Sequence, residues 1–242
     1  MKIYAILKNA MKIGKEMRQL IKGILFDFDE TLLNRKDSVN IFIRDQYKRY
    51  LTCLADIEEE QFCSRFIALD NNGYTWKDRV YEQLVDEYEL TISSEALLED
   101  YICSFHLHCK PFIGLIDMLD CLKSSGYLLG LITNGRTAFQ YRNISALGIE
   151  NYFDVILISE QEGVKKPEKV IFQRALERLD LKASQTVFIG DHEINDIKGA
   201  SDAGMKTIWK KRFNTSEELG DASIQSLLEI PQVLNEWKRL GM

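Results

Sequence analysis

Hydrophobic and polar positions follow two different rhythms along this chain of 242 residues. Between about residues 36 and 109, apolar residues recur at the spacing of amphipathic helices, and no strand-like run interrupts them. After Pro111, short apolar runs alternate with helical segments. The first region therefore predicts about four helices. The second predicts a parallel sheet with helices on both of its faces.

The elements of the alternating region can be assigned one by one. The alternating pattern predicts strands at residues 127–132, 154–158, 186–190 and 206–210. Helices are predicted at residues 114–125, 137–147, 167–179, 195–203 and 231–240. Pro167 and Pro231 fall in the first turns of their predicted helices, where proline is favoured. A further apolar run at residues 22–27 predicts a first strand, so the helical region is an insertion between this strand and the rest of the sheet.

The first predicted strand ends in Asp27-Phe28-Asp29. If the backbone stays extended through Asp27, Phe28 points away and both carboxylates lie toward one side. Two carboxylates that close repel each other, so they need a cation or one raised pKa. A magnesium site in which Asp27 attacks and Asp29 carries protons meets both needs.

Polar residues also follow the other predicted strands. Thr133-Asn134 comes before a helix, Lys166 precedes Pro167, and Asp191 and Asp196 follow the strand at 186–190. Each of these alone is commonly a cap, a turn former or a solvated side chain. Ligands in such sheets bind beyond the carboxyl ends of the strands. Four strand ends that carry a carboxylate pair, a hydroxyl, a lysine and a second carboxylate pair therefore favour one shared site.

These four motifs resemble the ordered motifs of the haloacid dehalogenase-like (HAD) superfamily, over nearly the whole chain from about residue 22. The helical insertion falls between the first two motifs, as in members with an α-helical cap of the first type. The resemblance implies an α/β fold: a doubly wound, Rossmann-like parallel-sheet core at residues 21–35 and 111–242, with a helical bundle cap at 36–110. Residues 1–20 are an N-terminal extension outside the match, and translation from Met1 or from Met17 stays open.

The resemblance also implies roles for the motif residues. Asp27 is the expected nucleophile, which forms an aspartyl-phosphate, and Asp29 is the expected general acid and base. Thr133 and the amides near Asn134 are expected to hold the phosphoryl group, and Lys166 to balance its charge against Asp27. Lys165 is the alternative lysine.

The expected cofactor is Mg²⁺. The resemblance implies that Asp191 binds it together with Asp27 and the main-chain carbonyl of Asp29, and that Asp196 is a nearby metal carboxylate. Hard oxygen ligands of this kind suit magnesium.

The expected function is a magnesium-dependent phosphatase that acts on a small phosphorylated metabolite, such as a nucleotide monophosphate or a sugar phosphate. The presence of Asp29 favours phosphoryl transfer over halide displacement. HAD dehalogenases release a halide, so they need no acid to protonate an alkoxide leaving group, and they lack the second aspartate. A phosphomutase of the same superfamily is the alternative enzyme. A phospho-accepting receiver-like module or a binding module is the alternative outside the enzymes.

Composition and charge narrow the partners and the compartment. The net charge of −6 argues against a nucleic acid polymer as the main partner, although it leaves a phosphorylated substrate open. No apolar run has the length of a membrane span. The five cysteines show no paired spacing and are typical of a reducing compartment, so a cytoplasmic protein is expected. The oligomeric state is not predicted.

The turn at residues 70–73 interrupts the helical pattern of the expected cap. Polar residues in or just after it are the candidates for reading the leaving group of the substrate, the alternative being a solvent-exposed loop. They are Asn71, Asn72, Lys77 and Arg79.

Overall fold

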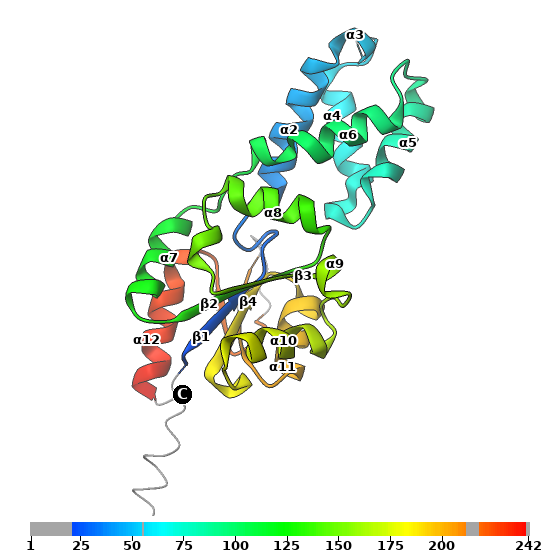
Figure 1. Cartoon of the computed structure of the whole chain (residues 1–242). Helices are drawn as coiled ribbons and strands as arrows, with labels where there is room; N and C mark the ends of the chain where they lie inside the picture. The colour runs from blue at the N-terminus through cyan, green and yellow to red at the C-terminus, as the bar shows by residue number, and fades with distance from the viewer. Residues whose placement is uncertain (1–20, 55, 212–217, 241–242) are drawn as a thin grey trace, which may run out of the picture. The chain divides into compact units, whose positions relative to one another are not determined.

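The computed structural model describes residues 21–54, 56–211 and 218–240 (Figure 1). Their Cα positions divide into two compact units. Of the described residues, those from 21 to 32, from 112 to 137 and from 149 to 240 form one unit, and those from 33 to 111 and from 138 to 148 form the other. The expected N-terminal extension, residues 1–20, lies outside the described residues. It includes both possible start residues, Met1 and Met17. No helix of the described chain combines the length and the apolar character that a membrane crossing requires.

The first unit is built on a six-stranded parallel sheet in the order β3-β2-β1-β4-β5-β6. The strands are β1 (Gly23–Phe26), β2 (Leu128–Thr133), β3 (Val155–Ile158), β4 (Thr186–Gly190), β5 (Lys206–Lys210) and β6 (Ala222–Ile224). Every residue of β1 and β4 is buried, as expected for central strands of a sheet covered on both faces. The strand order reverses between β1 and β4, which confirms the predicted doubly wound α/β fold.

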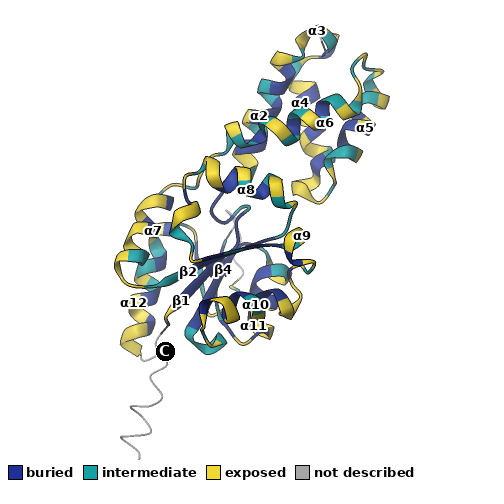
Figure 2. Ribbon diagram, in the orientation of Figure 1, coloured by how far each residue is buried: buried dark blue, intermediate teal, exposed yellow. Residues whose placement is uncertain are grey.

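Helices cover both faces of this sheet (Figure 1). Helices α7 (Leu115–Ser124) and α12 (Ile230–Leu240) pack against each other on one face. Helices α10 (Lys169–Leu179) and α11 (Gly199–Asp202) lie on the other, and the short α9 (Ser159–Glu162) follows β3. Figure 2 shows the result as buried strands between helices whose outer faces are exposed.

Three details of this unit differ from the sequence prediction. Helix α10 begins at Lys169 rather than Pro167, because residues 165–168 form a turn in which the Glu168 amide donates to the Lys165 carbonyl. The helix predicted at 195–203 is a π-helix, η5 (Glu193–Lys198), followed by α11. Strand β6 was not predicted, since three residues are too few for a periodic signal.

The second unit is helical. Its helices are α2 (Arg35–Arg49), α3 (Leu51–Leu54), α4 (Glu59–Asp70), α5 (Lys77–Tyr88), α6 (Ser94–Ser104) and α8 (Thr137–Ala146), of which α8 lies in this unit from residue 138. Ser93 caps α6 by accepting a hydrogen bond from the Ala96 amide.

Helix α8 groups with this unit although it follows β2 in the alternating part of the sequence. The Phe139 ring stacks with its centroid 5.4 Å from both the Tyr101 and Phe105 centroids. Arg142 also donates to the Ile102 carbonyl. The compact units therefore differ from the expected boundaries, in which the helical domain ended at residue 110, because aromatic packing joins α8 to α6.

Candidate active site

The carboxyl end of β1 delivers Asp27. Its amide continues the sheet ladder by donating to the Ile189 carbonyl on β4 at 2.9 Å. The chain then turns sharply, and the Leu32 amide donates back to the Phe28 carbonyl at 2.9 Å. Asp27 is buried and Asp29 is half-buried.

Both carboxylate oxygens of Asp27 accept hydrogen bonds. The Lys166 ammonium donates to Oδ1 at 2.5 Å, and the Thr31 hydroxyl donates to Oδ2 at 3.0 Å. Thr31 was not assigned a role from the sequence, although it stands four residues after Asp27 within the first motif. These two contacts fix the orientation of the Asp27 carboxylate.

Lys166, and not Lys165, is the lysine at Asp27. Its side chain is buried and also donates to Oδ1 of Asp196 at 2.7 Å, whereas Lys165 is exposed. The Asn134 side chain holds the Lys166 backbone from both sides: its amide donates to the carbonyl at 3.0 Å, and its oxygen accepts from the Lys166 amide at 2.9 Å. The amides near Asn134 were expected at the phosphoryl group, and this stays a prediction; the side chain of Asn134 holds the backbone of Lys166.

Asp191 and Asp196 follow β4. Oδ2 of Asp196 accepts from the His192 amide at 3.0 Å, so each of its oxygens has a protein donor. A side chain at Gly190 would place its Cβ 2.5 Å from Asp196, so only glycine permits this close approach. Trp209 donates from Nε1 to the Asp191 carbonyl at 2.8 Å.

Three of the buried carboxylates converge. One oxygen each from Asp27, Asp191 and Asp196 lie within 4.8 Å of one another. Carboxylate oxygens are the ligands that Mg²⁺ prefers, so this donor set fits magnesium. The oxygens of Asp196 accept from Lys166 and His192, and those of Asp27 accept from Lys166 and Thr31. Asp27, Asp191 and Asp196 are therefore all candidate ligands of a metal ion in this cluster.

The charges in this cluster do not balance. Burial raises the pKa of Asp27 to about 7, with Lys166 opposing the rise and Asp196 and Asp29 adding to it. Burial also raises the pKa of Asp196 despite Lys166. Burial lowers the pKa of Lys166, but the charges of Asp196 and Asp27 outweigh it and hold that pKa above its ordinary value. One lysine among several buried carboxylates leaves the site short of positive charge.

Thr133 is buried at the end of β2, beside the edge at which Asp27 emerges. The register pairs Phe26 with Leu131, two residues before Thr133. The next loop is ordered by Ser159, whose hydroxyl accepts from the Gly135 amide at 2.9 Å. The structure therefore brings the second motif to the same sheet edge as the first.

The residues proposed to read the leaving group differ among themselves. Asn71 and Asn72 are exposed and have positive φ angles. Lys77 forms an ion pair with the buried Asp70, and its ammonium lies 5.6 Å from the centre of the Tyr101 ring. Arg79 is exposed and pairs with Glu82. A role in specificity stays a prediction for all four.

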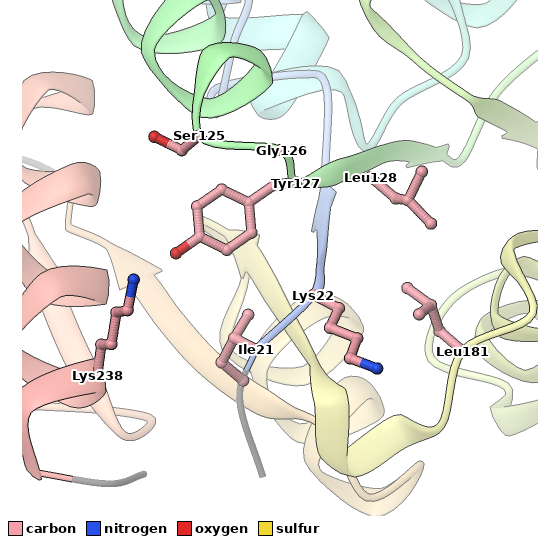
Figure 3. Close-up of a pocket in the computed structure, with 8 residues that line it drawn as sticks. All are labelled: Ile21, Lys22, Ser125, Gly126, Tyr127, Leu128, Leu181 and Lys238. Carbon is pink, nitrogen blue, oxygen red and sulfur yellow. The ribbon is translucent and has the colours of Figure 1, made fainter. Parts of the chain in front are cut away.

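A separate pocket lies at the opposite end of the sheet (Figure 3). Ile21 and Lys22, which precede β1, line it together with Tyr127 before β2 and Lys238 on α12. Asp27 follows the other end of β1. The pocket is therefore distinct from the carboxylate cluster.

Comparison with known proteins supports one family. Residues 24–210 match the family model described as haloacid dehalogenase-like hydrolase. The chain is 32% identical over 228 residues to a glyceraldehyde 3-phosphate phosphatase of Methanocaldococcus jannaschii, covering 91% of this chain and 100% of the relative. It is 30% identical to the pyrimidine 5'-nucleotidase YjjG of Escherichia coli, covering 87% of this chain and 96% of the relative.

A solved structure shows the same fold. A HAD-hydrolase, YfnB, of Bacillus subtilis bound to magnesium aligns with a TM-score of 0.71 and 25% identity, covering 89% of this chain and 99% of the other. The motif residues, their meeting at one sheet edge and these matches lead to one conclusion. The chain belongs to the haloacid dehalogenase-like hydrolase family.

Proposed function

We propose that the protein is a magnesium-dependent phosphatase that hydrolyses a small phosphorylated metabolite through an aspartyl-phosphate on Asp27. The observation that carries the proposal is the buried Asp27 carboxylate, held by Lys166 and Thr31 and adjoining two further buried carboxylates. A carboxylate fixed in this way at a strand end is suited to nucleophilic attack.

The first half of the reaction transfers the phosphoryl group. An oxygen of Asp27 forms a bond to phosphorus while the ester P–O bond breaks, and the Asp29 carboxyl gives its proton to the leaving oxygen. Lys166 and Thr133 bind the phosphoryl oxygens. Because the transferring group is an anion entering a cluster of carboxylates, positioning and charge neutralisation dominate the barrier.

The second half restores the enzyme. The Asp29 carboxylate takes a proton from a water molecule, whose oxygen attacks phosphorus and displaces the Asp27 carboxylate, so that inorganic phosphate leaves. Asp29 thus acts first as an acid and then as a base, and ends protonated for the next cycle.

The magnesium ligands in this proposal are Asp27, Asp191 and the Asp29 carbonyl. When bound, the ion supplies the positive charge that Lys166 alone cannot provide. Asp196 supports the site by holding the Lys166 ammonium, as its 2.7 Å contact indicates.

The names of the relatives indicate the size of the substrate. One acts on a triose phosphate and another on pyrimidine nucleotides, and both are small phosphate monoesters. We infer a substrate of this class for the present chain.

A substrate panel tests the proposal. The purified protein is assayed with Mg²⁺ against glyceraldehyde 3-phosphate, nucleoside 5'-monophosphates, sugar phosphates and p-nitrophenyl phosphate, and kcat/KM is compared. Phosphate release that is abolished by a chelator and restored by Mg²⁺ is expected. The absence of release from every ester with any divalent metal would overturn the proposal, and phosphoryl transfer within a sugar phosphate without release would favour a phosphomutase.

A further inference from the structure

A buried lysine outside the four motifs lies next to the first of them. Lys210 is the last residue of β5, and only 5% of its surface is exposed. Its ammonium donates to the Glu30 carbonyl at 2.9 Å and lies 3.3 Å from the centre of the Phe112 ring. Burying an ammonium is costly unless its partners are well placed, so this contact is a specific feature of the fold.

The Glu30 carbonyl belongs to a strained turn. Glu30 has a φ of 60°, in the left-handed region that residues with a side chain rarely adopt. Such a conformation is energetically unfavourable and persists where its surroundings hold it in place. Lys210 is one of the groups that hold it.

The other end of the turn, at Leu32, is bound by Phe112, the residue that also contacts Lys210. The Phe112 amide donates to the Leu32 carbonyl at 3.0 Å, and the Lys210 ammonium lies over the Phe112 ring. Lys210 therefore joins the segment that follows Asp29 to the segment that returns at residue 112. Asp29 directly precedes Glu30, the residue whose carbonyl accepts from Lys210.

We propose that Lys210 is a positioning residue for Asp29: by holding the Glu30 carbonyl, it keeps the Asp29 carboxyl in place to protonate the leaving oxygen. This inference rests on the proposed phosphatase function. A proton donor must lie within hydrogen-bond reach of the leaving oxygen, and a displacement of about 1 Å can cost about 100-fold in rate. Lys210 acts through Asp29 and does not itself touch the reacting atoms.

The leaving group provides a readout that a purely structural role would not change. p-Nitrophenolate leaves readily without a proton, whereas the alkoxide of benzyl phosphate needs one. The two esters are similar in size, and kcat/KM reports the steps up to departure of the leaving group. Misplacing Asp29 should therefore slow benzyl phosphate much more than p-nitrophenyl phosphate.

The experiment compares Lys210→Met with Lys206→Met in the full-length chain. Lys206 lies at the other end of β5, where it pairs with Asp221 and lies 5.0 Å from the centre of the Trp237 ring, so the control removes a similar lysine away from the site. For Lys210→Met, kcat/KM is expected to fall about 100-fold for benzyl phosphate and less than about threefold for p-nitrophenyl phosphate. Lys206→Met should leave the ratio of the two values unchanged.

A double-mutant cycle separates positioning from general damage. In an Asp29→Asn background, Lys210→Met should no longer change the ratio between the two esters, because the group it positions is gone. Circular dichroism and thermal unfolding check that each variant is folded. If Lys210→Met does not fold, Lys210→Gln is measured by the same criterion.

The outcomes are distinguishable. Equal losses on both esters by an otherwise active enzyme would overturn the positioning role and leave the proposed function standing. A wild-type enzyme that hydrolyses neither ester nor any member of the substrate panel would overturn the proposed function and, with it, the role of Lys210.

Discussion

Two buried aspartates, one in each unit, have opposite surroundings. Asp27 in the sheet unit shares Lys166 with Asp196 and adjoins Asp191, so carboxylates outnumber cations. In the helical unit, Arg35 donates to both oxygens of Asp70, at 3.0 and 2.8 Å, and Lys77 forms a further ion pair with it. There, cations outnumber the carboxylate.

The pKa values of the two aspartates follow the number of cations and carboxylates around each of them. Burial raises the pKa of Asp27 to about 7 because a single lysine cannot compensate for it. Burial also acts to raise the pKa of Asp70, but Arg35 and Lys77 overcome this and hold it below the ordinary value of 3.8. A buried aspartate by itself therefore does not identify a catalytic site. Asp27 differs from Asp70 because the carboxylates around it outnumber the cations, so that a bound metal ion is needed beside Lys166 to balance their charge. The carboxylate of Asp70 is already paired with Arg35 and Lys77.

The largest expected effect is the loss of turnover when Asp27 is replaced. Asp27→Asn should abolish turnover and phosphoenzyme formation, since an amide cannot act as the nucleophile. The fold should remain, because the amide has nearly the same shape as the carboxylate. Steady-state assays, trapping of the phosphoenzyme and circular dichroism measure these outcomes, and full activity in this variant would refute the mechanism.

The next effect separates two adjacent lysines. Lys166→Met should reduce kcat/KM by at least about 100-fold, since it removes the cation that stabilises charge in the transition state. Lys165→Met is the matched control, and because Lys165 is exposed it should retain activity close to wild type. If Lys165→Met lost activity and Lys166→Met did not, the assignment of Lys166 to the active site would be wrong.

The corresponding change in the helical unit should affect stability. Asp70→Asn leaves Arg35 and Lys77 without their common carboxylate, and breaking such a buried pair costs about 3 kcal/mol of unfolding free energy. Urea unfolding measures the change. Glu82→Gln, which breaks the exposed pair with Arg79, should cause no measurable change. Equal stability of the two variants would show that Asp70 is not held as the structure describes.

The smallest effect is the acid dependence of that stability. The folded-state pKa of Asp70 is lowered, so its contribution is fully present above 3.8 and is lost as the pH falls through the folded value. The unfolding free energy of the wild type should therefore fall more steeply below pH 3.8 than that of Asp70→Asn. Parallel acid profiles for the two proteins would contradict this assignment.

Much of the fold could be predicted because its signals are local. Strands β4 and β5 were predicted at their observed limits, 186–190 and 206–210, since both follow the alternation of short strands and helices in this part of the chain. The position of Asp27 at the end of the first strand follows from the apolar run at residues 22–27. Helix α8 shows the limit of such signals. Its periodicity predicts a helix, but it groups with the helical unit through tertiary contacts, namely the packing of Phe139 on Tyr101 and Phe105 and the hydrogen bond from Arg142 to the Ile102 carbonyl.

The sequence by itself determined that the two carboxylates of the first motif follow a buried strand and that the other motifs follow neighbouring strands, because motif spacing and strand order restrict where side chains can meet. Only the tertiary structure decided which lysine reaches Asp27, that the Asn134 side chain holds this lysine, and that Lys210 supports the turn after Asp29. Lys210 and Glu30 are far apart in the chain, and a lysine at a strand end has the same local pattern whether it is solvated or buried. Contacts of this kind depend on long-range packing, which a pattern of neighbouring residues does not record.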